Sequence, residues 1–388
     1  MKDTRPLSAV SGNGFKAIIR FFQPDYVFPS HATLWKYIKL HYAQLQAQLR
    51  VDMKDRSVSI TTDLWTSTTM QPYITVTAHY LSDTWEMQAK VLCTLFMSER
   101  HTAVNIAQRL TDVIQEWGLD VFACVHDNAS SMNLAMSLCG EIQEDIGCTG
   151  HTLQLAIKKG LELPDVEKTI DAARRVVSHF RHSSVATCAL KTRQDALKVK
   201  DNRLQNDCAT RWNSTITMLE RLDEQRIPVQ AVLEDETVTK PATKKKLQMR
   251  PSQWELIQQL LPVLRPLAKA TTIMCAELHV GLSFIYPVIL NLLDEDVGVL
   301  RDDESDVAAA RNFKSTVRAQ LRTRFKLDTD DYNLMTSVPI IACFLDPRFK
   351  DLLFLPEQDR PKVFFSFHWN VLCMFINVIR VKNKLRLS

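Results

Sequence analysis

The chain has 388 residues, 46% of them hydrophobic, and a formal net charge of +4. This length is sufficient for a sizeable core and for two or three domains. The nine cysteines include no C-x-x-C pair, which argues against a disulfide framework. The first residues contain no apolar segment typical of a signal peptide, so we expect a reducing compartment, the cytosol or the nucleus.

Residues 1–52 carry apolar side chains at helical spacing, interrupted by Pro24 and Pro29. The apolar positions are Phe15, Ile18, Ile19, Phe22, Leu34, Tyr37, Ile38 and Tyr42. We interpret the segment as an N-terminal helical accessory segment that packs against other parts of the chain.

From Ser57 onward the hydrophobic period changes to two. Alternating apolar residues predict three strands, and the short links between them favour an antiparallel meander. Helical spacing follows at 104–117, with Gly118 as the stop signal, and residues 121–125 predict a short buried strand. A helix that crosses over before this strand favours parallel pairing with the first strand of the meander.

Two acidic residues follow strand-like runs and precede polar turn residues. Asp63 follows the first predicted strand, and Asp127 follows the run at 121–125. Carboxylates in this position lie at the C-terminal rim of a sheet, where the two could share a metal ion. The alternative for each aspartate is a structural turn cap.

Several motifs together resemble the hAT-family DNA transposases and, more narrowly, the zinc-finger BED-domain (ZBED) proteins descended from them. They occur in the family's order, and the resemblance extends from about residue 14 to residue 360. The motifs are Thr62-Asp63-Leu64-Trp65-Thr66-Ser67, Glu99-Arg100-His101-Thr102, His126-Asp127-Asn128-Ala129-Ser130, Cys148-Thr149-Gly150-His151 and Thr210-Arg211-Trp212-Asn213.

The resemblance implies an α/β (α+β) fold, in which a ribonuclease H-like core is interrupted by a large all-helical insertion. We divide the chain accordingly into an accessory segment, the first part of the core, the insertion, a return toward the core and a divergent tail. The corresponding ranges are 1–52, 53–163, 164–340, 341–362 and 363–388.

By the same resemblance, Asp63 and Asp127 match the first two acids of a DDE-type catalytic triad. Two divalent ions about 4 Å apart stabilise the attacking and leaving oxygens in such phosphodiester chemistry. Carboxylate oxygens suit Mg²⁺, so Asp63 and Asp127 are candidate Mg²⁺ ligands. The pair Cys148 and His151 has half the spacing of a zinc site, but we find no suitable second pair and expect no zinc site.

Residues 168–203 contain nine Lys or Arg against three Asp, a local charge of +6. Such a block can neutralise DNA phosphates, although the alternative is a solvated helix face. We assign Arg174, Arg175 and Arg181 to DNA binding on this basis. Arg211 and Trp212 supply a cation beside an aromatic ring, and the family's matching tryptophan stabilises a flipped base. The alternative for Trp212 is a core anchor.

His151 is a further candidate DNA contact or support for the acids, and its alternative is a histidine packed at a helix N-terminus. The third acid of the family's triad is a glutamate in a Ser-Glu-Arg motif downstream of the insertion. Ser98-Glu99-Arg100 matches a different family segment, so the third acid and the last part of the core are missing from this chain.

The tail at 363–388 departs from the family. Its first 17 residues, 363–379, include thirteen apolar side chains and no acid, Lys or Arg, and basic residues follow. We interpret the tail as a foreign continuation rather than a membrane-spanning helix.

We therefore predict a truncated, domesticated hAT-transposase-like protein of the nucleus, which binds DNA or chromatin in transcription and is not an enzyme. No cofactor is required, and Mg²⁺ at Asp63 and Asp127 is optional. Without the family's dimerisation region we expect a monomer or weak oligomer and no membrane partner. The alternatives are an active Mg²⁺-dependent DDE transposase fragment and a protein-interaction scaffold.

Overall fold

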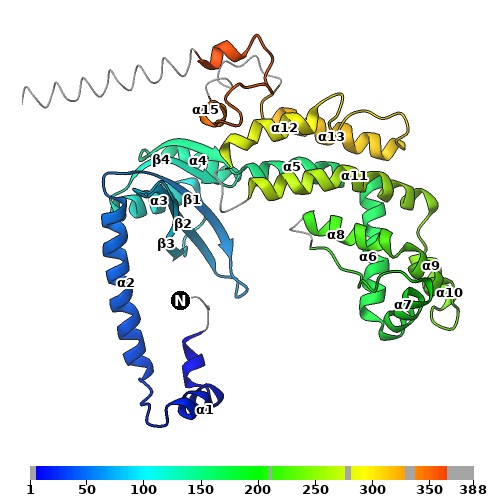
Figure 1. Ribbon diagram of the computed structural model, residues 1–388, viewed down its shortest axis with the longest axis horizontal. Coiled ribbons are helices and arrows are strands. Elements are labelled where there is room, and N and C mark those ends of the chain that lie inside the picture. Colours follow the sequence, from blue (N-terminus) through cyan, green and yellow to red (C-terminus); the bar gives the residue numbers. More distant parts are fainter. Residues whose placement is uncertain (1–5, 209–211, 276–280, 328–336, 365–388) are drawn as a thin grey trace, which may run out of the picture. The chain divides into compact units, whose positions relative to one another are not determined.

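The computed structural model describes residues 6–208, 212–275, 281–327 and 337–364 (Figure 1). The chain forms two compact units, Met1–Ile146 and Gly147–Ser388, and each is described by itself. Eight of the nine cysteines lie among the described residues, and all eight are free thiols. None of the described helices combines the length and the apolarity that a membrane span requires.

The first unit is built on a five-stranded sheet in the order β3-β2-β1-β4-β5. Its elements are η1 (Leu7–Ser11), α1 (Asn13–Phe22), α2 (His31–Met53), β1 (Ser57–Thr66), β2 (Pro72–Leu81), β3 (Met87–Phe96), α3 (Ala103–Trp117), β4 (Asp120–His126), α4 (Ser130–Leu138) and β5 (Ile142–Gly147). The antiparallel meander β1-β2-β3 and the parallel pairing of β1 with β4 confirm the predicted topology. The sequence analysis missed β5.

Alternation along β1 separates a buried face from an open one. Val58 and Ile60 are fully buried and share one hydrophobic core with side chains of α3 and α4. The side chains between them point to the other face, as the two-residue period requires. Helix α3 ends where the sequence predicts, because Gly118 adopts a left-handed conformation (φ 64°) and its N–H bonds back to the last turn.

The accessory segment does not pack as predicted. Helices α1 and α2 form over the expected residues, but Phe22, Tyr37 and Tyr42 are 78%, 62% and 56% exposed. Met53, at the end of α2, is the single buried residue in these two helices. The periodicity therefore identified the helices correctly, whereas helical spacing alone could not show whether another element covers their apolar side chains.

The second unit is helical in the described residues. Its elements are α5 (Thr149–Leu161), α6 (Pro164–His182), α7 (Ser184–Leu197), α8 (Trp212–Glu224), α9 (Arg226–Glu234), α10 (Pro241–Leu247), α11 (Pro251–Met274), η2 (Leu282–Phe284), α12 (Ile285–Leu293), α13 (Ala308–Arg324) and α15 (Val338–Leu345). Helices α5, α11 and α13 pack against one another (Figure 1).

The boundary between the units differs from the predicted boundary at residue 163. Helix α5 belongs to the helical unit because it packs closely against α13. A Cβ added to Gly160 would lie 2.7 Å from ring atoms of Phe313 and from a methyl carbon of Val317. Both partners are fully buried. A residue without a side chain at position 160 therefore permits the close approach of the two helices.

We expect Gly160→Ala to destabilise the helical unit by about 1–3 kcal/mol, because the added methyl group overpacks the contact with Phe313 and Val317. Chemical denaturation followed by circular dichroism measures the effect. The matched control is Gly14→Ala in α1, where an added Cβ has no neighbour within 4 Å, so that the change is neutral or stabilising by up to about 1 kcal/mol. An unchanged denaturation midpoint for Gly160→Ala would contradict the close packing.

Candidate functional site

The two acids predicted at the sheet edge come from neighbouring parallel strands. The register between β1 and β4 pairs Val58 with Val121, then shifts by one residue and continues to Thr61 paired with Val125. Extended by two residues along both segments, this register would bring Asp63 level with Asp127, which lies just after the end of β4. Without the shift, Asp63 would be level with His126. The bulge therefore decides which side chain of β4 and its loop accompanies Asp63.

Asp63 lies inside a strand and not after one, which corrects the predicted strand end. Strand β1 continues to Thr66, and Asp63 is paired with Thr75 of β2. The side chain is exposed, on the face opposite Ile60. The strand continues because β2 offers antiparallel partners for five residues of β1 beyond the last pair with β4, up to Thr66 opposite Pro72. Asp63 thus presents its carboxylate from a rigid element.

Asp127 follows β4 directly, as predicted, and the loop there is held by hydrogen bonds. The main-chain N–H of Ala129 donates to Asp127 Oδ1 at 3.2 Å, which is the predicted turn cap. His126 Nδ1 lies 2.6 Å from the main-chain oxygen of Asp127 and donates to it, since a carbonyl only accepts. The carboxylate is therefore fixed in orientation, and the turn cap and the candidate ligand are the same residue.

His126 is a residue of this site that the sequence analysis did not single out. Its ring is 2% exposed, and Nε2 lies 3.8 Å from a carboxylate oxygen of Asp145 on β5. Because β5 was not predicted, nothing in the sequence indicated this neighbour. The buried ring of His126 thus holds the loop of Asp127 through Nδ1, and Asp145 lies beside its Nε2.

An aromatic row extends from the exposed face of β1 beyond Asp63. The rings of Trp65 and Tyr73 stack with centroids 4.9 Å apart, and Tyr73 meets Phe96 edge to face at 5.8 Å. Trp65 Nε1 donates to Thr75 Oγ1 at 3.0 Å, which fixes the indole. Trp65 and Phe96 stay 42% and 48% exposed. Asp63 therefore borders an exposed, ordered aromatic surface.

Asp63 and Asp127 carry the type of oxygen ligand that a hard divalent ion takes. Mg²⁺ commonly binds to one or two carboxylates and keeps several waters, so Asp63 and Asp127 are chemically suitable ligands. Within the described part of the chain, no three His, Cys, Asp or Glu side chains cluster closely enough to hold a metal ion. When bound, the ion would supply positive charge to a phosphate oxygen at this edge of the sheet.

The Ser98-Glu99-Arg100 segment has a structural role. Glu99 accepts from Arg109 of α3 at 2.7 Å, and this hydrogen bond lowers the pKa of Glu99 to about 2. Glu99 thereby joins the segment after β3 to α3.

The predicted DNA-binding residues of the helical unit differ in their surroundings. Arg175 and Arg181 are exposed on α6, and the described residues provide neither with an ion-pair or hydrogen-bond partner. His151 is partly exposed in the first turn of α5. Arg211 lies outside the described residues. His151 belongs to the helical unit, whereas Asp63 and Asp127 belong to the first unit.

Arg174 is engaged inside the protein, in contrast to its neighbours. Its guanidinium donates to both carboxylate oxygens of Asp207 at 2.7–3.0 Å and to Asp171 at 2.9 Å. The Asp207 side chain is 7% exposed and also accepts from Thr215 Oγ1 at 3.0 Å. Arg174 therefore ties α6 to α8 and the segment before it. This use as an internal anchor argues against a direct DNA contact.

Trp212 occupies the position expected of a core anchor, yet it borders a cavity. Its side chain is 6% exposed and belongs to the core of the helical unit. It lines a cavity of about 340 Å³ together with Lys158, Arg174 and Thr215. The indole Nε1 is buried and has no hydrogen-bond partner among the described residues. Trp212 therefore packs in the core, as the anchor alternative predicts, and its indole N–H has no acceptor among the described residues.

Two architectural features define the class of protein. One is a sheet of order β3-β2-β1-β4-β5 with Asp63 in β1 and Asp127 directly after β4, and the other is a helical unit. This is an RNase-like domain followed by a helical domain. The family described as the ZBED1 RNase-like domain matches residues 61–155, and the ZBED1 RNase-like helical domain matches residues 146–262. The start of the second match agrees with the unit boundary after Ile146.

Proteins that are similar to this chain over more than half of its length agree with these domain matches. Human zinc finger BED domain-containing protein 6 is 25% identical over 97% of this chain, and human zinc finger BED domain-containing protein 4 is 24% identical over 92%. The Drosophila melanogaster transposable element Hobo transposase is 23% identical over 57% of it. The matches cover 39%, 30% and 35% of these relatives, so the chain spans less than half of their length. The chain belongs to the ZBED-like proteins derived from hAT transposases.

We expect either Asp63→Asn or Asp127→Asn to weaken Mn²⁺ binding, used here as a probe for Mg²⁺, by at least about ten-fold. A single carboxylate leaves the ion with one charged ligand fewer, which lowers the affinity of a hard-cation site. Electron paramagnetic resonance of free Mn²⁺ gives the dissociation constant. Asp120→Asn, at the opposite end of β4, is the matched control and should retain the affinity. Equal affinities in all four proteins would exclude a shared site.

We expect Asp207→Asn to destabilise the helical unit by about 2 kcal/mol at pH 7, because Arg174 and Thr215 lose a charged acceptor. Burial would raise the pKa of Asp207, but the hydrogen bonds from Arg174 and Thr215 outweigh it and the pKa is lowered. A lowered pKa stabilises the fold above the unfolded-state value near 3.8 and loses this contribution as the pH falls further. The difference between wild type and variant in denaturation should therefore shrink below about pH 4.

A pH-independent difference would show that the charge of Asp207 does not contribute. Asp195→Asn, an exposed aspartate on α7, is the matched control and should change stability by less than about 0.5 kcal/mol.

Proposed function

We propose that this chain is a nuclear DNA-binding protein that acts on chromatin or transcription and does not cut DNA. The observation that carries the proposal is the set of unpartnered arginines on the helical unit. Arg175, Arg181 and Arg203 are exposed and have no ion-pair or hydrogen-bond partner among the described residues. Cations in this state can take up phosphates without first breaking contacts inside the protein.

The neighbouring acids strengthen this argument because most are already paired. Asp171 and Asp207 are held by Arg174, Asp201 lies 3.5 Å from Lys191, and Asp235 lies 2.9 Å from Arg193. These acids are therefore paired with other cations, and they do not neutralise the arginines of residues 168–203 that face solvent. What supports DNA as the partner is this uncompensated charge together with a relative that bears the name transposase.

Binding without cleavage is the second part of the proposal. The described residues contribute two carboxylates at the edge of the sheet, which suit one divalent ion, whereas phosphodiester cleavage by two ions needs more ligands. The aromatic row of Trp65, Tyr73 and Phe96 beside Asp63 offers a surface on which a base could stack. The RNase-like unit would then contact DNA as a binding surface.

A Mg²⁺-dependent DNA transposase is the second candidate function, and the paired acids Asp63 and Asp127 are the observation that favours it. A protein-interaction scaffold is the third. It is favoured by the exposed apolar side chains of α1 and α2, including Phe22 and Tyr37. The three candidates differ in affinity for DNA and in strand cleavage, so one set of measurements separates them.

We expect Arg175→Gln combined with Arg181→Gln to weaken binding to duplex DNA and to reduce the salt dependence of that binding. If each arginine meets one phosphate, the slope of log K against log salt should fall by about 2. Fluorescence anisotropy across a salt series gives both quantities. The matched control is Arg265→Gln with Lys269→Gln on α11, which removes the same charge elsewhere on the helical unit and should leave the slope unchanged.

Three results, two from anisotropy and one from a strand-cleavage assay, would contradict the proposal. Absence of DNA affinity in the wild type at physiological salt would favour the scaffold. An equal loss in the α11 control would show a general charge effect and no defined surface. Strand cleavage with Mg²⁺ that disappears in Asp63→Asn would establish the transposase instead, and Asp63→Asn should otherwise leave DNA affinity intact.

A further inference from the structure

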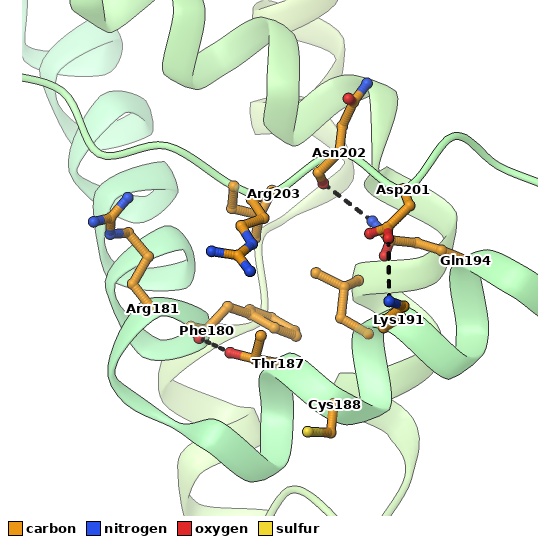
Figure 2. A pocket seen from close by; sticks show the side chains of 11 residues that line it. Phe180, Arg181, Thr187, Cys188, Lys191, Gln194, Asp201, Asn202 and Arg203 are labelled. Atoms are coloured by element: carbon orange, nitrogen blue, oxygen red, sulfur yellow. Dashed lines mark hydrogen bonds and ion pairs between the residues drawn. The ribbon is translucent and has the colours of Figure 1, made fainter.

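A pocket of about 450 Å³ opens between the end of α6, helix α7 and the segment at 201–204 (Figure 2). Its charged lining consists of Arg181, Lys191, Arg203 and one acid, Asp201. Figure 2 shows Arg203 reaching inward from the 201–204 segment, with Arg181 on one side of it and the paired Lys191 and Asp201 on the other. Three cations against one acid give the pocket an excess of two positive charges.

The cations of the pocket differ in how firmly they are held. Lys191 is engaged by Asp201 at 3.5 Å, a long and exposed ion pair that contributes little to stability. Arg181 and Arg203 have no such partner among the described residues. Like charges that line one cavity repel one another, so an anion bound between them would reduce that repulsion.

The walls of the pocket are rigid. Phe180, Leu190 and Leu204 are 2%, 5% and 3% exposed and form its apolar base. The amide of the buried Gln194 donates to the main-chain oxygen of Asn202 at 3.1 Å and to the side chain of Gln225 at 2.8 Å. Gln225 in turn donates to the main-chain oxygen of Lys200 at 3.0 Å.

This buried amide pair fastens the segment that carries Arg203 to α7 and to the start of α9. The segment would otherwise be a free loop, because it contains no helix or strand. The position of Arg203 opposite α6 is therefore built into the fold and does not require a ligand to create it.

We propose that this pocket is a phosphate-binding subsite, in which Arg203 and Arg181 grip the phosphate oxygens and Lys191 adds a third cation. A guanidinium presents N–H donors in a planar fork that matches two oxygens of a phosphate. Lys191 can exchange Asp201 for the phosphate, since the existing pair is exposed.

The phosphate could belong to a DNA backbone or to a free phosphate compound. In the first case the inference rests on the DNA-binding function proposed above and assigns Arg203 and Lys191 to that surface. In the second case the pocket binds its ligand irrespective of DNA. Both cases share the same chemistry, and a reporter inside the pocket distinguishes them.

Cys188 is such a reporter, because its exposed thiol lines the pocket. The full-length chain is alkylated with a maleimide, and the rate at each cysteine is followed by peptide mass spectrometry. The probes are a DNA duplex and, in a separate arm, inorganic phosphate. At a probe concentration ten times its dissociation constant, alkylation of Cys188 should slow by about ten-fold. Cys275, which is exposed on the C-terminal side of α11, is the internal reference and should react at an unchanged rate.

Arg203→Gln and Arg181→Gln should each weaken protection of Cys188 by about ten-fold in dissociation constant, because each removes a charged hydrogen-bond donor. Lys198→Gln removes the same charge just beyond α7, outside the pocket, and should protect like the wild type. Circular dichroism of the variants checks that they fold, as expected for exposed side chains.

Protection by the duplex supports a backbone contact, and protection by inorganic phosphate alone supports a small phosphate ligand. Absence of protection by both probes overturns the inference, even if DNA binds elsewhere. Equal loss in Arg203→Gln and Lys198→Gln also overturns it, because the effect would then be one of overall charge. A duplex that fails to bind at all, while inorganic phosphate protects Cys188, contradicts the DNA-binding proposal and leaves the pocket assignment standing.

Discussion

The parallel pairing of β1 with β4 is the constraint on which the RNase-like unit depends. Strand β1 is central, with β2 antiparallel on one side and β4 parallel on the other, so its register fixes both halves of the sheet. The one-residue shift after Val58 then aligns Asp63 with Asp127. Two carboxylates at adjacent positions repel each other, and a divalent ion is a natural way to offset that repulsion. A structural irregularity inside the sheet thus decides that an acid, and not His126, accompanies Asp63.

The helical unit depends on a different interaction, the buried carboxylate of Asp207. By accepting from Arg174 and Thr215 it joins α6 and α8 to the described segment at 199–208. The ion pair between Asp207 and Arg174 also separates the basic residues of 168–203 into those that stabilise the fold and those that face solvent. Arg174 stabilises the fold, whereas Arg175, Arg181 and Arg203 face solvent without partners among the described residues. A count of charges cannot make this distinction, because it depends on which acids the folded chain brings within reach.

Much of the first unit could be predicted because its signals are local. Alternation along β1 and β2, helical spacing up to Trp117 and the left-handed Gly118 all act within a few residues. Strand β5 escaped prediction because Gln143, Glu144 and Asp145 make it polar and exposed, so it lacks the apolar pattern of a strand. The accessory helices themselves were predicted, but their packing was not, since Phe22 and Tyr37 have a core-like pattern and yet face solvent. The predicted tail at 363–388 lies almost entirely outside the described residues.

The sequence by itself determined the family, the two acids and the basic block, since motifs and charge are properties of the chain in order. It also placed Asp127 correctly in the loop after a strand. Only the tertiary structure decided that Asp63 sits within β1 and level with Asp127, that Arg174 is an internal anchor, and that Arg181, Lys191 and Arg203 line one pocket. Each of these results requires residues distant in sequence to meet, and such meetings follow from register and packing and not from local pattern.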